Sequence, residues 1–126
     1  MSDTENFDGP TVEPDNYVRA ADGTVRAVEP DEAPLVSQAW DANVAAVQDA
    51  RMALRAARLR AGQVEDRVTA QARKRDPRRP LLNAAEHAEL EQEYADVDAA
   101  RAANAEAGRR FKAGVTAEQI QLVRNP

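Results

Sequence analysis

Several residue types on which common functional sites depend are scarce or missing in this sequence. The chain of 126 residues has no cysteine and a single histidine, His87. The absence of cysteine excludes disulfides, thiolate metal sites and cysteine nucleophiles. A single imidazole excludes the usual metal centres that are built from several histidines. We therefore expect no metal-binding site.

Long apolar runs and the sequence motifs of common enzymes are also missing. No stretch approaches the roughly 20 apolar residues that a membrane-spanning helix needs, and residues 1–10 lack the apolar segment of a secretory signal. No glycine-rich phosphate loop, nucleophile elbow or HExxH motif occurs. We expect no membrane contact, cofactor, small-molecule substrate or enzyme activity. The expected location is the cytoplasm or, for a chain of phage origin, the virion.

The acidic residues around His87 do not change this expectation. Glu86, Glu89 and Glu91 lie close to it in the sequence, and a histidine beside carboxylates can act as a base or a metal ligand. Acid–base catalysis by paired carboxylates, however, needs a pocket that separates their pKa values. A glutamate-rich helix beside an arginine-rich one more simply forms solvated ion pairs. We interpret His87 as a surface residue and predict no catalytic site.

Charge is segregated along the chain, whose formal net charge is -5. Residues 1–34 carry nine acids and two bases, residues 35–75 carry four acids and eight bases, and residues 84–113 carry seven acids and four bases. The basic segment and the acidic segment that follows it are expected to pair with each other. Residues 1–33 are predicted to form an acidic, extended and solvated N-terminal arm.

Two short alternating runs interrupt this arm. Residues 17–20 and 24–28 flank Asp22-Gly23, which is a typical turn of a β-hairpin. An isolated two-stranded hairpin is only marginally stable in water. A hairpin at 17–28 would therefore have to dock on another part of the protein, and a fully extended arm is the alternative.

The rest of the chain predicts an all-α fold, with an antiparallel two-helix coiled-coil hairpin over residues 34–113. The first helix is expected to end at Arg75, because Pro77 and Pro80 cannot continue it and place the turn at 76–80. Its apolar seam repeats every seven residues. The seam comprises Trp40, Val47, Leu54, Ala61 and Val68.

The second long helix is expected to run from Asn83 to Ala113. Asn83 and Glu86 have the spacing of a capping box, which satisfies backbone N–H groups at a helix start. The short break between the helices implies an antiparallel pair. The register predicts that Val68 lies opposite Leu90, Ala61 opposite Val97 and Val47 opposite Phe111.

Residues 114–126 predict a short C-terminal helix. Thr116 and Gln119 have the spacing of a second capping box, and Val115 with Ile120 fits a hydrophobic staple. We expect this helix to bury its apolar residues against the hairpin.

The first long helix carries a second apolar strip on the side away from the seam. At 100° per residue, Met52 and Leu59 lie nearly opposite Leu54. Such a strip usually has a partner, so we expect an oligomer or a larger assembly. In the alternative, a compact monomer, the N-terminal hairpin and the C-terminal helix cover the strip. The predicted partner interface comprises Trp40, Ala45, Met52, Ala56 and Leu59.

Trp40 has two interpretations within this prediction. It is the only tryptophan in the chain. Its seam spacing favours a place in the core of the hairpin, whereas tryptophan is also enriched as an anchor of protein interfaces.

A basic tip is predicted at the turn. It comprises Arg73, Lys74, Arg75, Arg78 and Arg79. Cations suit the C-terminus of a helix, but the cluster could also bind phosphates or an acidic protein surface. No aromatic residue is interleaved with these cations, which argues against base stacking. A second basic ridge lies beside the seam at Arg51, Arg55 and Arg58.

These features favour an interaction role. The chain has 27 alanines, 15 arginines and only 2 lysines, which is typical of GC-rich genomes such as those of actinobacteria and their phages. Small helical chains of this composition with extended arms resemble bacteriophage virion accessory and scaffolding proteins. Our hypothesis is a non-catalytic helical-hairpin protein that acts as a structural or assembly component of a larger complex. The alternative is a nucleic-acid-associated accessory factor that uses the basic tip.

Overall fold

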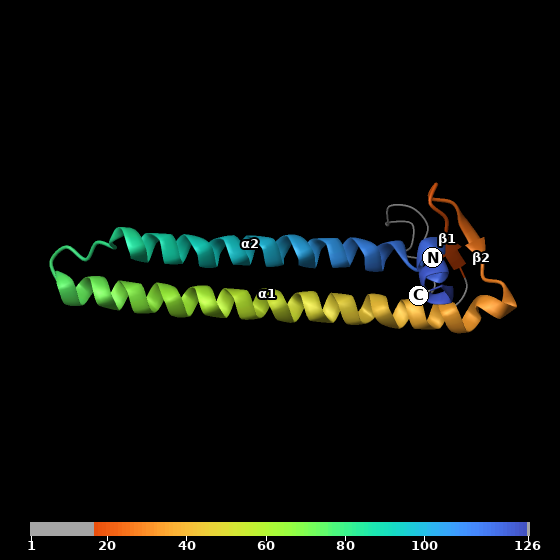
Figure 1. Cartoon of the computed structure of the whole chain (residues 1–126), viewed down its shortest axis with the longest axis horizontal. Coiled ribbons are helices and arrows are strands. Elements are labelled where there is room, and N and C mark those ends of the chain that lie inside the picture. Colours follow the sequence, from red (N-terminus) through yellow and green to blue (C-terminus); the bar gives the residue numbers. More distant parts are fainter. Residues whose placement is uncertain (1–16, 126) are drawn as a thin grey trace, which may run out of the picture. The chain divides into compact units, whose positions relative to one another are not determined.

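The structure, a computed structural model, describes residues 17–125 and is mostly helical (Figure 1). Its elements are β1 (Tyr17–Arg19), β2 (Val25–Ala27), the 3-10 helix η2 (Pro30–Glu32), α1 (Ala33–Arg75), α2 (Ala84–Ala113) and α3 (Ala117–Arg124). The predicted fold is confirmed, because the two long helices pack together and a short third helix follows them. Residues 1–16, the first part of the predicted arm, lie outside the described residues.

The described residues form two compact units, and both long helices contribute to each of them. We call residues 48–106 the hairpin unit. The described residues up to 47 and from 107 onward form the terminal unit.

The terminal unit contains the β-hairpin that the alternating runs predicted. β1 and β2 pair antiparallel, with Val18 opposite Arg26. Gly23 adopts a φ of 92° in the turn, a conformation that residues with a side chain rarely adopt. The side chain of Asp22 accepts hydrogen bonds from the backbone N–H of Thr24 at 3.0 Å and from its hydroxyl at 2.7 Å. The extended-arm alternative is therefore wrong for residues 17–28.

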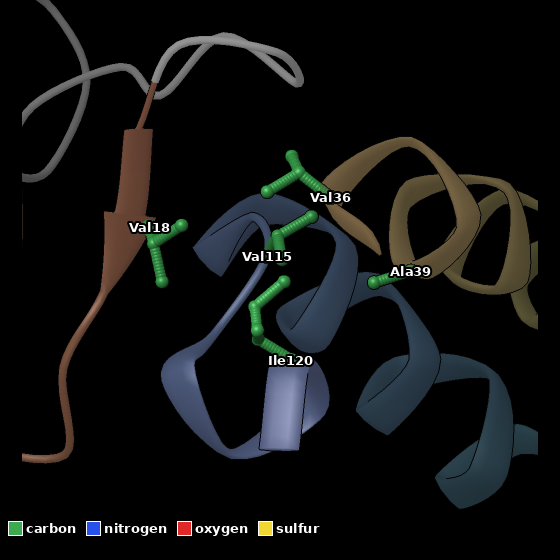
Figure 2. Close-up of a cluster of buried hydrophobic side chains, with 5 residues drawn as sticks. All are labelled: Val18, Val36, Ala39, Val115 and Ile120. Atoms are coloured by element: carbon green, nitrogen blue, oxygen red, sulfur yellow. The ribbon is translucent and has the colours of Figure 1, made fainter. Parts of the chain in front are cut away.

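The β-hairpin docks on a small apolar core, as its marginal stability requires. The core residues come from β1, α1, α3 and the link before α3, and their side chains face one another in Figure 2. They are Val18, Val36, Ala39, Val115 and Ile120, each at most 3% exposed. Arg19 fixes the strand in place. Its backbone N–H donates to the carbonyl of Val115 at 2.9 Å, and its Nε donates to the carbonyl of Ala113 at 2.9 Å.

The start of α3 confirms the predicted capping box. The Thr116 hydroxyl accepts a hydrogen bond from the backbone N–H of Gln119 at 3.1 Å, and the Gln119 side chain accepts one from the backbone N–H of Thr116 at 3.0 Å. Gly114, with a φ of 79°, ends α2 in the left-handed conformation that favours glycine. Together these features turn the chain from α2 into α3, so that Val115 and Ile120 reach the same core.

In the hairpin unit, α1 and α2 meet along the predicted seam. Its buried cluster comprises Leu54, Ala57, Ala61 and Val97, with Ala100 packed against it. Ala61 and Val97 are thus brought together as the register predicts. Because most of these side chains are small, the two helices can approach closely.

Polar contacts across the seam support the same register. Arg67 donates to the carboxylate of Glu89, and the Tyr94 hydroxyl donates to Glu65 at 2.7 Å. Arg60 lies 3.9 Å from Glu93. The basic segment of α1 therefore pairs with the acidic segment of α2, as the charge distribution predicts.

Candidate functional site

Most of the predicted interface lies exposed on α1. In the hairpin unit, the side chains of Met52 and Leu59 are 69% and 63% exposed, and Ala56 is exposed as well. Leu54 in the same stretch of helix is only 8% exposed, because it faces α2. The helical period explains this contrast, since residues two positions apart point about 200° away from each other. We call Met52, Ala56 and Leu59 the outer strip.

The two remaining predicted interface residues belong to the terminal unit and differ from each other. Ala45 is exposed. Trp40 is half-buried, packs against the apolar core and places its ring 5.0 Å from that of Phe111, at an interplanar angle of 42°. The pairing of Val47 with Phe111 stays a prediction. Trp40 thus packs within the chain, as its seam spacing favours, and its part in a partner contact stays a prediction.

The elements that the compact-monomer alternative assigns to the strip have packing partners within the terminal unit. The β-hairpin and α3 pack on Val36 and Ala39 in the terminal unit, whereas Met52 and Leu59 remain exposed. The compact-monomer alternative, like the oligomer, therefore stays a prediction for the outer strip.

A basic flank borders the outer strip. Arg51, Arg55 and Arg58 are exposed and lie to one side of Met52 and Leu59 on the helical projection. Because all three point to the same side, the apolar strip has a positively charged rim. Such a polar rim around an apolar patch is typical of protein interfaces.

The opposite helix of the hairpin unit carries a feature that the sequence reasoning missed. Ala88, Ala95 and Ala102 are exposed and recur every seven residues on the outer side of α2. Glu91 and Asp98, also exposed, lie beside them. The signal was the heptad spacing of these alanines, which a search for large apolar residues does not detect. We call the three alanines the alanine stripe.

The five cations of the predicted basic tip have different roles in the structure. Arg75, although exposed like the other cations, donates two hydrogen bonds to the carboxylate of the buried Glu86, at 2.8 and 2.5 Å, and one to the carbonyl of Leu81 at 3.1 Å. Glu86 also completes the predicted capping box, because it accepts from the backbone N–H of Asn83 at 2.9 Å and its own N–H donates to the Asn83 side chain at 2.8 Å. The Arg75 guanidinium and the Asn83 N–H lower the pKa of Glu86 to about 2. Arg75 therefore holds the turn closed.

The other four cations of the basic tip are exposed. They are Arg73, Lys74, Arg78 and Arg79. The turn itself is ordered by Asp76, whose side chain accepts hydrogen bonds from the backbone N–H groups of Arg78 at 3.1 Å and of Arg79 at 3.3 Å. The tip therefore presents positive charge on a fixed backbone.

The terminal unit has a similar arginine–glutamate pair, which the sequence reasoning did not identify. Arg26 of β2 donates to both carboxylate oxygens of Glu32, at 2.7 and 2.9 Å, and the backbone N–H of Glu29 donates to the same carboxylate at 3.1 Å. These bonds lower the pKa of Glu32 to about 2. The three-residue spacing of Glu29 and Glu32 could have indicated a helix start there. Glu32 itself is buried.

A polar pair also lies within the terminal unit. The Gln119 side chain of α3 donates to the Asn43 amide oxygen of α1 at 2.6 Å. Asn43 is buried, so this bond satisfies a group that would otherwise be costly to remove from water. It ties α3 to α1 in a defined position.

The predicted surface role of His87 agrees with its placement. His87 is exposed on α2, and its neighbour Glu86 is committed to Arg75 and Asn83. Over residues 17–125, no group of three or more histidine, aspartate or glutamate side chains is arranged to hold a metal ion.

None of the helices described is both long enough and apolar enough to cross a bilayer. Models of protein families, curated protein sequences and solved structures give no match to this chain.

Proposed function

We propose that this chain is a non-catalytic helical-hairpin interaction protein, a structural or assembly component of a larger protein complex. The observation that carries the proposal is the exposure of Met52 and Leu59 on a helix whose other side is already packed. Burying a large aliphatic side chain contributes about 1.5–3 kcal/mol. Two such side chains, seven residues apart, give a partner helix a favourable surface to cover.

The kind of complex that we propose is a bacteriophage virion or its scaffold. The abundance of alanine and arginine over lysine and the acidic N-terminal segment support this proposal. The protein would then reside in the virion, and otherwise in the cytoplasm. Trp40 and Ala45 would extend the contact on the terminal unit.

The alternative proposal is a nucleic-acid-associated accessory factor. The exposed cations of the basic tip, Arg73, Lys74, Arg78 and Arg79, favour it. Binding through such cations is salt-dependent, because each phosphate contact releases counterions. This dependence distinguishes the alternative from assembly through an apolar strip.

The main experiment measures molar mass by size-exclusion chromatography with light scattering. We expect the unmodified protein to elute at a multiple of 13.7 kDa, or with a bound protein partner, at low and at high salt. A Met52→Glu, Leu59→Glu variant should lose this association, because it places charges in the contact. A matched control, Ala53→Glu with Gln71→Glu, adds the same charges at exposed positions on another side of α1 and should behave like the unmodified protein. If the Met52 and Leu59 variant associates as the unmodified protein does, the proposed role of the outer strip is wrong.

The same elution profile tests the alternative. Absorbance at 260 nm that elutes with a monomer and disappears in high salt would favour nucleic-acid binding. An Arg78→Ala, Arg79→Ala variant should then lose that absorbance, while the Met52→Glu, Leu59→Glu variant should retain it. Association without nucleic acid that is independent of salt would argue against this alternative.

A further inference from the structure

We propose that the outer strip of α1 binds the alanine stripe on α2 of a second copy of this chain. This inference rests on the proposed function and names its partner. The contact joins two different surfaces, both within the hairpin unit, so each copy would offer one surface of each kind.

The two surfaces match in spacing and size. Met52 and Leu59 are seven residues apart on α1, and Ala88, Ala95 and Ala102 are seven residues apart on α2. Equal heptad spacing on both helices allows one register to place Met52 and Leu59 against two alanines of the stripe. The large side chains of one surface would fill the space that the methyl groups of the other leave open. Both surfaces are exposed within the single chain.

An antiparallel pairing of the two helices satisfies both surfaces at once. If Met52 lies opposite Ala102 of the second copy, Leu59 lies opposite its Ala95. Ala56, the member of the outer strip on the side away from the arginines, then comes beside Ala99, which is also exposed. Small residues therefore meet on this side of the contact, and the two helices can approach closely.

Charge on the other side of the contact is complementary. Arg55, with Arg51 and Arg58 further round the helix, flanks the outer strip, and Glu91 and Asp98 flank the alanine stripe. Each helix of an antiparallel pair can be viewed from its own N-terminus. Residues that are rotated in the same direction from the two contact lines then lie on the same side of the pair and face each other. The two charged flanks are rotated in the same direction, so in this register Arg55 would face Asp98.

Intramolecular pairing of these acids does not oppose the contact. Asp98 lies 3.0 Å from Arg101 of its own helix, and both side chains are well exposed. Exposed pairs of this kind contribute little to stability, so Asp98 can exchange Arg101 for Arg55 at little cost.

The same charges argue against the outer strip of a second copy as the occupant. In an antiparallel pair of two outer strips, Arg55 and its neighbours would face the same arginines of the second copy. Like charges placed against each other disfavour such a complex. Charge therefore selects α2 rather than α1 of the second copy.

A contact between two different surfaces has a consequence for assembly. A copy bound through its outer strip still has its alanine stripe available, and a third copy can bind there. Such contacts produce closed rings or open rows rather than closed dimers. This outcome agrees with a role in building a larger structure.

Two blocked variants test the inference. Met52→Glu with Leu59→Glu blocks the outer strip. Ala95→Arg with Ala102→Arg blocks the alanine stripe by bulk and by repulsion from Arg55. We expect each variant alone to associate about tenfold more weakly or worse and to elute as a monomer. Mixed in equal amounts, they should form a heterodimer of twice 13.7 kDa, because each retains the surface that the other lacks.

Controls and contrary outcomes complete the design. Circular dichroism should show that both variants remain helical, and Ala103→Arg, at an exposed position away from the stripe, should associate normally. If blocking the alanine stripe leaves association unchanged while blocking the outer strip abolishes it, this inference is wrong and the proposed function stands. A mixture that stays monomeric, or an unmodified protein that never self-associates, also overturns the inference. If neither blocked variant changes the association, both proposals fail.

Discussion

The terminal unit and the hairpin unit both have cores of small apolar side chains, and they differ in how uniformly these side chains are buried. In the terminal unit, a strand, two helices and the link before α3 surround the core, and Val18 and Val36 are fully buried. In the hairpin unit, two helices meet along one seam, where Leu54 and Val97 each remain 8% exposed. All the core side chains of the terminal unit are thus at most 3% exposed, whereas along the single seam burial varies from residue to residue, from the fully buried Val68 to Leu54 and Val97.

This difference also explains where the candidate interface lies. A helix that contacts a single neighbour can bury only one side, so large residues on its other side stay in water. The exposed Met52 and Leu59 are on such a helix. A third element plays this covering role in the terminal unit, and we propose that a second copy plays it in the hairpin unit.

The largest expected effect comes from removing one large side chain from each core. Ile120→Ala, at a position 3% exposed, should lower the stability of the terminal unit by about 3 kcal/mol. Leu54→Ala should cost the hairpin unit about 2 kcal/mol, because its seam leaves more of the side chain in water. Urea unfolding followed by the fluorescence of Trp40, which lies in the terminal unit, and by far-ultraviolet circular dichroism separates the two effects.

Exposed leucines provide the controls for this comparison. Leu122→Ala in the terminal unit and Leu59→Ala in the hairpin unit, with both side chains more than 60% exposed, should each change monomer stability by less than about 0.5 kcal/mol. The comparison is wrong if Leu54→Ala lowers the urea concentration at the midpoint of the Trp40 fluorescence transition as much as Ile120→Ala does.

The second prediction concerns acid. The pKa of Glu32 and that of Glu86 are about 2, against an ordinary value of 4.5, because each carboxylate is held by an arginine and a backbone N–H. A carboxyl with a lowered pKa stabilises the fold above its unfolded value, and this contribution is lost as the pH falls through the folded value. The free energy of unfolding should therefore decrease between about pH 4.5 and pH 2.

Single substitutions assign this pH dependence to each unit. Glu32→Gln should weaken the pH dependence of the unfolding free energy measured by Trp40 fluorescence, which reports on the terminal unit. Glu86→Gln should weaken the pH dependence of the unfolding free energy of the hairpin unit, measured by circular dichroism. Both variants should also be less stable at pH 7. Glu91→Gln, at an exposed position outside these clusters, serves as the control. A pH dependence that survives both substitutions would show that other carboxyl groups cause it.

The smallest expected effect comes from glycines inside the helices. Gly62 lies in the hairpin unit and Gly108 in the terminal unit, and a Cβ added at either position would meet nothing within 4 Å. Alanine should therefore stabilise each unit by about 1 kcal/mol. The opposite result is expected for Gly23→Ala, because its φ of 92° strains any side chain. Thermal unfolding of the three variants measures these shifts.

Local patterns in the sequence predicted much of this fold. The prolines of the turn, the capping boxes at Asn83 and Thr116 and the heptad seam fixed the helix ends and the pairing of Ala61 with Val97. Each of these signals depends on residues a few positions apart, or on a period that two facing helices share. The exposure of Met52 and Leu59 followed from the same period.

Contacts that join distant segments could not be predicted in this way. The bonds from Arg19 to Ala113 and from Gln119 to Asn43 depend on how β1 and α3 dock on the long helices. No short pattern encodes such a meeting. The pairing of Arg75 with Glu86 was missed for a related reason, since a cluster of cations in the sequence does not indicate which member binds a carboxylate.

The closed turn has a consequence for the speed of folding. The bond between Arg75 and Glu86 spans 11 residues, whereas the bond between Arg19 and Ala113 spans 94. Closing the longer loop costs about 2 kcal/mol more in chain entropy. We therefore expect the helices to join from the turn outward, before the terminal unit forms. In stopped-flow refolding, helical signal should then appear before the Trp40 fluorescence change, and simultaneous signals would contradict this order.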